Sequence, residues 1–306
     1  RPWTGSATRY ESLRLRSEQT IKSRGKHVKG RVLIIAGSDS GGGAGIQADI
    51  KAVTVLGGFA MTAITALTAQ NTLGVHDIHG VSEDFITKQI DVVLGDLGAD
   101  AIKTGMLHSP SVIQTVVSAL SGCGAPIVVD PVMRAKGGAA LLQPEAQAAL
   151  VVLLLPRATL LTPNVPEAEA LTGLSISSVA DLRTVGERLL SMGPKAVLMK
   201  GGHLEGAAMT DVLVTEDGAT VIGLGRERLD TLHTHGTGCT LASATAAGLA
   251  QSLTMQRSVE RAVAYVDRAI RLAPGYGQGH GPINHAHPLE RADAQDDWFD
   301  GDDDND

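Results

Sequence analysis

The chain has 306 residues, of which 43% are hydrophobic, 19% charged and 3% aromatic, and its formal net charge is −7. This length and hydrophobic content allow a sizeable buried core and exclude a fully disordered chain. The longest uninterrupted apolar run, residues 148–155, is too short to cross a membrane, and two cysteines, Cys123 and Cys239, are too few for a disulfide framework. We therefore predict a globular cytoplasmic protein without a membrane partner.

The two ends of the chain carry opposite charge. Residues 1–31 contain nine Lys or Arg and two Glu, whereas residues 293–306 contain eight Asp and no Lys or Arg. Such runs are usually solvated, so we predict a disordered basic head (1–30), one folded domain (31–289) and a disordered acidic tail (290–306). The head has the composition of an organelle transit peptide, and an unstructured arm is the simpler alternative. The body is mildly acidic, which argues against a nucleic-acid partner.

The folded part opens with a strand, a glycine loop, a helix and a second strand. Residues 31–36 are a short apolar run, residues 37–45 are rich in glycine, residues 46–56 have a helical pattern, and residues 59–67 are typical of a buried strand. This order is that of a βαβ unit, in which a helix connects two parallel strands.

The alternation of strands and helices continues along the chain. We expect strands at 101–104, 126–130, 159–162 and 196–200, and helices at 84–94, 109–120, 144–154, 167–171 and 179–192. A hairpin of residues 211–214 and 219–222 follows, and then two Ala-rich helices at 238–251 and 255–272. Apolar strands indicate a sheet covered on both faces, so we predict a single α/β domain with a mostly parallel sheet. Ligands bind such sheets at the carboxyl ends of the strands.

The first glycine loop contains Gly43-Ala-Gly45-Ile-Gln-Ala48, a match to the loose dinucleotide-binding fingerprint. A Rossmann oxidoreductase also needs an acidic residue about 20 positions further on, and there is none between Asp49 and Asp77. The Walker A lysine is missing too, which excludes a P-loop NTPase. The alternative interpretation, that this loop is only a tight turn and binds no ligand, remains open. Asp49, one turn into the helix, either faces the strand ends or only opposes the helix dipole.

The strongest local signal is His233-Thr-His-Gly-Thr-Gly-Cys239-Thr, directly before an Ala-rich helix. Gly236 and Gly238 free the backbone to point successive N–H groups into one concavity, which is the geometry of an anion hole at a helix N-terminus. The same helix dipole would lower the pKa of Cys239 and make it a thiolate base or nucleophile. A cysteine buried in helix packing is the equally weighted alternative.

Two further clusters follow predicted strands. Asn164 and Glu167 open a helix, where Glu167 either contacts a metal through water or merely caps the helix. Lys200 follows an apolar strand, where a lysine can reach a nucleotide phosphate; an ordinary surface lysine is the alternative.

Taken together, these motifs resemble the bacterial hydroxymethylpyrimidine/phosphomethylpyrimidine kinases of the ribokinase superfamily. The resemblance covers about residues 31–289 and rests on seven motifs in order: 35–52, 64–75, 102–107, 128–133, 161–171, 197–203 and 234–240. It implies a ribokinase-like fold and a homodimer that uses ATP and Mg²⁺. It also implies phosphorylation of an aminopyrimidine alcohol and then of its monophosphate, in thiamine biosynthesis. One departure is Ser40-Gly41, where the family often has Pro-Ser.

The resemblance also implies roles for single residues. The pyrimidine pocket would consist of Gly37, Asp49, Gln70, Met106 and Val132, with Gln70 reading the ring amine and Asp49 holding the polar edge of the ring. Lys200, Asn164 and Thr237 would bind ATP, and Asp130 and Glu167 would lie at Mg²⁺. Lys200 would also be catalytic, because it would neutralise charge in the transition state. The anion hole would consist of Gly236, Thr237 and Gly238. Cys239 would be the catalytic base, at a position where many relatives in the superfamily have Asp.

Two other functions remain open. Pyridoxal-type kinases share this fold, but an amide such as that of Gln70, suited to an aminopyrimidine, has less to do against a pyridine ring. A catalytically silent sensor of the pyrimidine would keep the pocket motifs without needing Lys200, Glu167 and Cys239, all of which are present.

Overall fold

The computed structural model describes residues 29–204 and 208–289. The predicted tail, and the predicted head except for its last two residues, lie outside this range. Among the helices of the described residues, none combines the length and apolar character that a membrane crossing requires.

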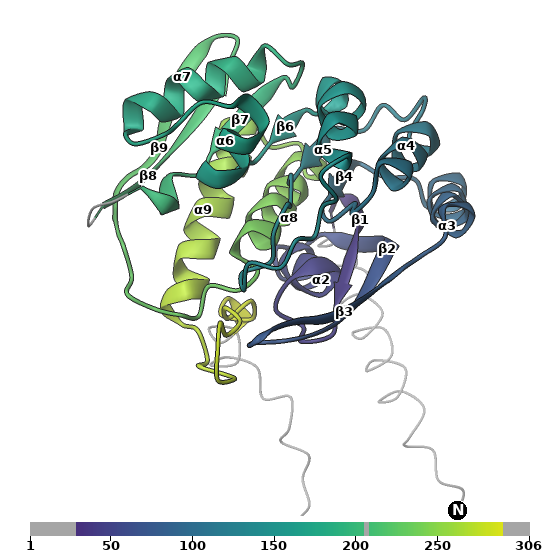
Figure 1. Cartoon of the computed structure of the whole chain (residues 1–306), viewed down its shortest axis with the longest axis horizontal. Helices are drawn as coiled ribbons and strands as arrows, with labels where there is room; N and C mark the ends of the chain where they lie inside the picture. The colour runs from purple at the N-terminus through teal and green to yellow at the C-terminus, as the bar shows by residue number, and fades with distance from the viewer. Residues whose placement is uncertain (1–28, 205–207, 290–306) are drawn as a thin grey trace, which may run out of the picture.

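A nine-stranded sheet forms the centre of the molecule, in the order β3-β2-β1-β4-β5-β6-β7-β8-β9 (Figure 1). The strands are β1 (Arg31–Asp39), β2 (Phe59–Asn71), β3 (Gly74–Gly80), β4 (Ala101–Thr104), β5 (Ile127–Val129), β6 (Leu160–Leu161), β7 (Ala196–Met199), β8 (Ala208–Thr215) and β9 (Gly218–Glu227). The strands from β2 to β7 in this order pair in parallel, whereas β3, β8 and β9 pair antiparallel at the two edges. The predicted α/β class with a mostly parallel sheet is confirmed.

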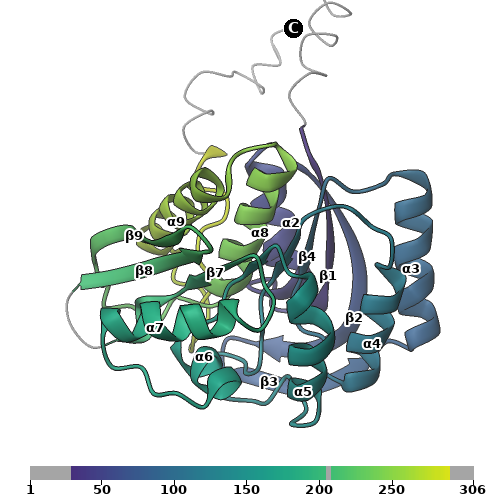
Figure 2. The same ribbon diagram turned by 90° about the horizontal axis from the view of Figure 1, so that it is seen from above.

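Helices cover both faces of the sheet (Figure 2). One face packs against α2 (Gly45–Val55), α8 (Thr237–Ala250) and α9 (Met255–Arg271). The other packs against α3 (Glu83–Asp96), α4 (Pro110–Ala119), α5 (Ala146–Ala149), α6 (Val165–Thr172) and α7 (Val179–Leu190). Successive residues of a strand point to opposite faces, so Val32 and Ile34 join the first core while Leu33 and Ile35 join the second. This explains why β1 reads as an uninterrupted apolar run.

The second strand differs from the prediction. It continues to Asn71 and is buried only in its middle part, so that Phe59 and Leu67 are each 46% exposed. Its last residues pair with β3, an antiparallel edge strand that the sequence did not indicate. The predicted helix 144–154 is also interrupted: α5 continues as a π-helical turn at Leu150–Leu154 and a 3-10 turn at Leu155–Arg157, where Pro156 is found.

Candidate active site

An open cavity of about 810 Å³ lies at the carboxyl ends of the parallel strands, where doubly covered sheets bind ligands. Most of the predicted site residues line it: Gly37, Gln70, Met106, Asp130, Val132, Asn164, Glu167, Lys200, Gly236, Thr237, Gly238 and Cys239. They come from the ends of β1, β2, β4, β5, β6 and β7 and from the start of α8. The topology thus brings together residues as far apart in the chain as Gly37 and Cys239.

The N-terminus of α8 opens into this cavity. Gly236 has a φ of 82°, and a Cβ there would lie 1.8 Å from the carbonyl oxygen of Gly43, so only glycine fits where the two loops meet. No side chain of the described residues caps this helix. A Cβ built on Gly238 would lie 3.4 Å from Lys200 Nζ and 3.6 Å from Asp130 Oδ2. The first turn of the helix therefore offers N–H donors beside a charged cluster.

This cluster consists of Lys200 and two carboxylates. Lys200 Nζ lies 3.3 Å from Asp130 Oδ1 and 3.9 Å from Glu167 Oε2. Burial alone would lower the pKa of Lys200, but the carboxylates of Asp130 and Glu167 outweigh it and raise the pKa. The lysine side chain is only 14% exposed, so the reading as an ordinary surface lysine is wrong.

Glu167 caps its helix and also faces the cluster. Its Oε2 accepts the backbone N–H of Asn164 at 2.9 Å, while Asn164 Oδ1 accepts the N–H of Glu167 at 2.9 Å, a complete capping box. Burial, reinforced by Asp130 and opposed by Lys200, raises the pKa of Glu167 to about 7. One or two carboxylates facing a space for substrate phosphates are the usual protein ligands of Mg²⁺, so this pair fits that ion.

Cys239 lines the cavity as predicted, but its ionisation does not follow the prediction. Burial, reinforced by Asp49 and Asp130, raises the pKa of the thiol to about 12. Lys103 and a hydrogen bond from the backbone of Gly45 act in the opposite direction and are too weak to compensate. The expected lowering by the helix dipole is therefore overturned by desolvation and by the nearby carboxylates.

Asp49 lies outside the cavity, contrary to its predicted place in the pyrimidine pocket. Its side chain is fully buried; Oδ2 accepts from Lys103 Nζ at 2.7 Å and Oδ1 accepts from Ser243 Oγ at 2.7 Å. Burial would lower the pKa of Lys103, yet Asp49 and the groups of Cys239 and Asp130 raise it, so Lys103 is a buried cation. Asp49 thus holds Lys103, and it is Lys103 that lines the cavity.

The comparisons with known proteins agree with this geometry. Residues 39–284 match the phosphomethylpyrimidine kinase family. The chain belongs to this family. It is 49% identical over 257 residues to the hydroxymethylpyrimidine/phosphomethylpyrimidine kinase of Bacillus subtilis, covering 83% of this chain and 94% of that protein. It is also 49% identical to the thiamine biosynthesis bifunctional protein ThiED of Geobacter sulfurreducens, over 84% of this chain and about half (52%) of that protein.

Solved structures show the same fold. A phosphomethylpyrimidine kinase from Clostridium difficile is 43% identical and has a TM-score of 0.71, over 79% of this chain and 100% of that one. An ADP complex of Bacillus subtilis pyridoxal kinase is 34% identical with a TM-score of 0.79, over 86% of this chain and 99% of that one. The ribokinase-like fold that the resemblance implied is confirmed.

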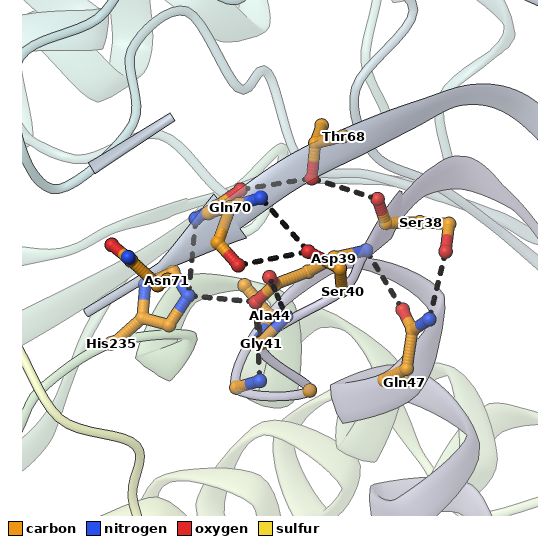
Figure 3. A network of polar contacts seen from close by, with 12 residues as sticks. Ser38, Asp39, Ser40, Gly41, Ala44, Gln47, Thr68, Gln70, Asn71 and His235 are labelled. Carbon is orange, nitrogen blue, oxygen red and sulfur yellow. Dashed lines mark hydrogen bonds and ion pairs between the residues drawn. The ribbon is translucent and has the colours of Figure 1, made fainter. Parts of the chain in front are cut away.

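A polar network at the cavity wall was not predicted from the sequence (Figure 3). Asp39, at the end of β1, accepts the backbone N–H groups of Gly41, Gly43 and Ala44 at 2.8, 3.1 and 2.8 Å. It also contacts His235 Nε2 at 2.8 Å. Burial would raise the pKa of Asp39, but these hydrogen bonds outweigh it and lower the pKa. An acidic residue two positions before a run of three glycines is the signal that would have found it.

Basic side chains without an assigned role line another wall of the cavity: Lys136, His203, Arg226 and Arg228. Burial, together with Lys200, lowers the pKa of Lys136, and burial together with Lys136 lowers the pKa of His203. Arg226 pairs with Asp211, and Arg228 donates to the carbonyl oxygens of Gly202 and Leu204. The excess of positive charge at this wall suits a polyanionic ligand.

Proposed function

We propose that this protein phosphorylates 4-amino-5-hydroxymethyl-2-methylpyrimidine, and then its monophosphate to the pyrophosphate, with ATP in thiamine biosynthesis. The observation that carries the proposal is the identity of 49% along 94% of the Bacillus subtilis kinase. It is supported by a cavity in which the motifs of that family meet at the N-terminus of α8. Both phosphorylations would use the same site, because each is an in-line transfer of a γ-phosphoryl group.

The proposed roles divide the lining residues between the pyrimidine and ATP. Gly37, Gln70, Met106 and Val132 would form the pyrimidine pocket. Lys200, Asn164 and Thr237 would bind the ATP phosphates, and the N–H groups of Gly236, Thr237 and Gly238 would stabilise charge that develops on the transferred group. Asp130 and Glu167 would hold Mg²⁺, which when bound neutralises phosphate charge.

We propose that Cys239 takes the proton of the substrate hydroxymethyl group. Because the pKa of its thiol is raised to about 12, the thiolate is a minor species at neutral pH. Lys103 is the cation that favours this thiolate, and it is held in place by Asp49. Phosphoryl transfer depends mainly on positioning and electrostatics, so a small reactive fraction of base is compatible with turnover.

Pyridoxal phosphorylation is the second candidate, and one observation favours it: the 34% identity and TM-score of 0.79 to a pyridoxal kinase. The identity to the pyrimidine kinases is higher, and the amide of Gln70 lines the cavity. A silent sensor is the weakest candidate, because Lys200, Glu167 and Cys239 all face the cavity. We also propose that the protein is cytoplasmic, which the free thiols of Cys123 and Cys239 support. We further propose that it is a homodimer, and sedimentation of the purified protein tests this oligomeric state.

The experiment is ADP release by the purified protein with Mg-ATP, offering the hydroxymethylpyrimidine, its monophosphate and pyridoxal in parallel. We expect turnover of both pyrimidines well above that of pyridoxal. Dominance of pyridoxal would move the protein to the second candidate, and saturable pyrimidine binding without turnover would favour the sensor. Gln70→Met is the matched variant: unchanged affinity for the pyrimidine would contradict the role of this amide.

A further inference from the structure

A short hairpin of residues 134–140 forms part of the cavity wall. Arg134 and Ala140 pair antiparallel at its base. A Cβ built on Gly137, at its tip, would lie 3.6 Å from the carbonyl oxygen of Leu73, in the turn that follows β2. The hairpin thus extends from the segment after β5 to the turn between β2 and β3.

This hairpin places Lys136 between the two proposed parts of the site. Its base follows Val132 and its tip contacts the turn after Gln70, so the hairpin borders the proposed pyrimidine pocket. Lys136 lines the cavity, and it is close enough to Lys200 of the charged cluster to be repelled by it. A group attached to the pyrimidine would meet the ATP phosphates in this part of the cavity.

Lys136 differs from the other two lysines of the cavity in having no acidic partner among the described residues. Lys103 is paired with Asp49, and Lys200 with two carboxylates. No carboxylate of the described chain acts on Lys136, and desolvation by the cavity walls, followed by repulsion from Lys200, lowers its pKa. Both effects disfavour the ammonium ion, and an anion bound beside the two lysines would oppose both.

The two proposed phosphorylations differ in the charge that the acceptor brings into the cavity. In the first, the acceptor is a neutral alcohol whose proton must be removed. In the second, an oxygen of the substrate phosphate attacks the γ-phosphorus of ATP, the bond to the β-phosphate oxygen breaks, and ADP leaves as the new P–O–P bond forms. A phosphate monoester carries a charge of about −1.5 to −2 at pH 7, so its attacking oxygen is already ionised. The second reaction therefore needs a further cation more than it needs a base.

We propose that Lys136 binds the phosphate of the monophosphate substrate and thereby favours the second phosphorylation over the first. The inference rests on the proposed function, which it makes more specific. Lysine binds phosphate as a point charge without a fixed geometry, which suits a phosphate that shifts as its oxygen forms the new bond. In this arrangement Lys200 neutralises the phosphates of ATP, and Lys136 neutralises that of the acceptor.

The test compares the two substrates in Lys136→Met. A charged hydrogen bond that is present both before and in the transition state lowers KM, so we expect KM for the monophosphate to rise at least about tenfold more than KM for the alcohol. Lys136→Arg keeps the charge and should recover most of this loss. Lys195→Met is the matched control, because it removes the same charge at the amino end of β7, away from the cavity; the ratio of the two KM values should stay within about twofold of the wild-type ratio.

Two kinetic results would overturn the proposal. An equal rise of KM for both pyrimidines, or a rise of KM for ATP in both reactions, would assign Lys136 to the nucleotide. A ratio of the two KM values in Lys136→Met equal to that of Lys195→Met would show that the hairpin lysine does not contact the substrate phosphate.

If the wild-type protein turns over neither pyrimidine, the proposed function fails, and calorimetric binding without ATP still decides the role of Lys136. Binding of the monophosphate that weakens at least about tenfold in Lys136→Met, with a smaller effect on the alcohol, supports the phosphate site. Equal binding of the monophosphate by the wild type and the variant, or binding by neither, overturns it.

Discussion

A buried thiol beside carboxylates ionises with difficulty, and this is the chemical problem that Cys239 presents. The protein places one compensating cation, Lys103, near the sulfur, and fixes that cation with Asp49. The surroundings therefore leave the thiol mostly protonated at neutral pH, with the thiolate fraction controlled by the solution pH.

This charge balance predicts the pH dependence of the reaction. A thiol with a pKa of about 12 gains thiolate about tenfold per pH unit between pH 7 and 9. If Cys239 is the base, the single-turnover rate rises with the same slope, and Cys239→Ala loses both the slope and about 100-fold or more in rate. A wild-type rate that does not change over this range would remove the cysteine from the role of base.

At the scale of single residues, the sequence located the cavity lining but not the direction of every side chain. Asp49 and Asp39 illustrate the limit. The spacing of the chain puts Asp49 one turn into α2, yet only packing determines that it faces Lys103 and Ser243 inside the core. Asp39 acquires its role from the path of the glycine loop, which turns the N–H groups of Gly41, Gly43 and Ala44 back onto it. The sequence marks the position only by an acidic residue shortly before three glycines, and it does not show that the N–H groups turn back onto that carboxylate.

At the scale of elements, the buried pair of Lys103 and Asp49 connects β4 to α2, and Ser243 extends the connection to α8. Both charged side chains are fully buried, so each depends on the other for compensation. A charge left alone in such a place has no solvent to stabilise it, which makes removal of one partner more costly than removal of both.

We therefore expect Lys103→Met to lower the free energy of unfolding by about 3–5 kcal/mol, measured by urea denaturation. The double variant Lys103→Met/Asp49→Leu should recover a large part of this loss. Arg31→Met is the matched control, because the Arg31–Asp100 pair is exposed to solvent on both sides and its loss should cost far less than that of Lys103. Equal losses in Lys103→Met and Arg31→Met would contradict the buried-pair interpretation.

The elements that the sequence missed lie where periodicity carries little information. The strand β3 is largely exposed and lies at the sheet edge, so Gly74–Gly80 lacks the apolar pattern that identified the central strands. It pairs antiparallel with the end of β2, from Ala66 to Asn71. The central strands were predictable because burial on both faces forces them to be apolar.

At the scale of the whole molecule, the segment after α9 is anchored to both helices of one layer through His285. His285 is 5% exposed and its Nε2 lies 2.9 Å from Thr240 Oγ1 of α8, while its backbone carbonyl oxygen accepts from Tyr265 Oη of α9 at 2.7 Å. Burial lowers the pKa of His285 to about 4, and Lys51, His235 and His287 contribute in the same direction. The folded protein thus needs this histidine to be neutral.

The fold should consequently lose stability on acidification through His285. The unfolded chain binds a proton at a pKa of about 6.5, whereas the folded protein resists it down to about 4, so the stabilisation is complete above pH 6.5 and is lost as the pH falls toward 4. Between pH 7 and 4.5 the wild-type free energy of unfolding should fall by roughly 2 kcal/mol more than that of His285→Gln, by urea denaturation at each pH. His79→Gln, at the exposed edge strand β3, controls for the loss of one histidine and should follow the wild type. Parallel pH profiles for the wild type and His285→Gln would show that the ring is protonated in the fold without cost, and that this anchor tolerates charge.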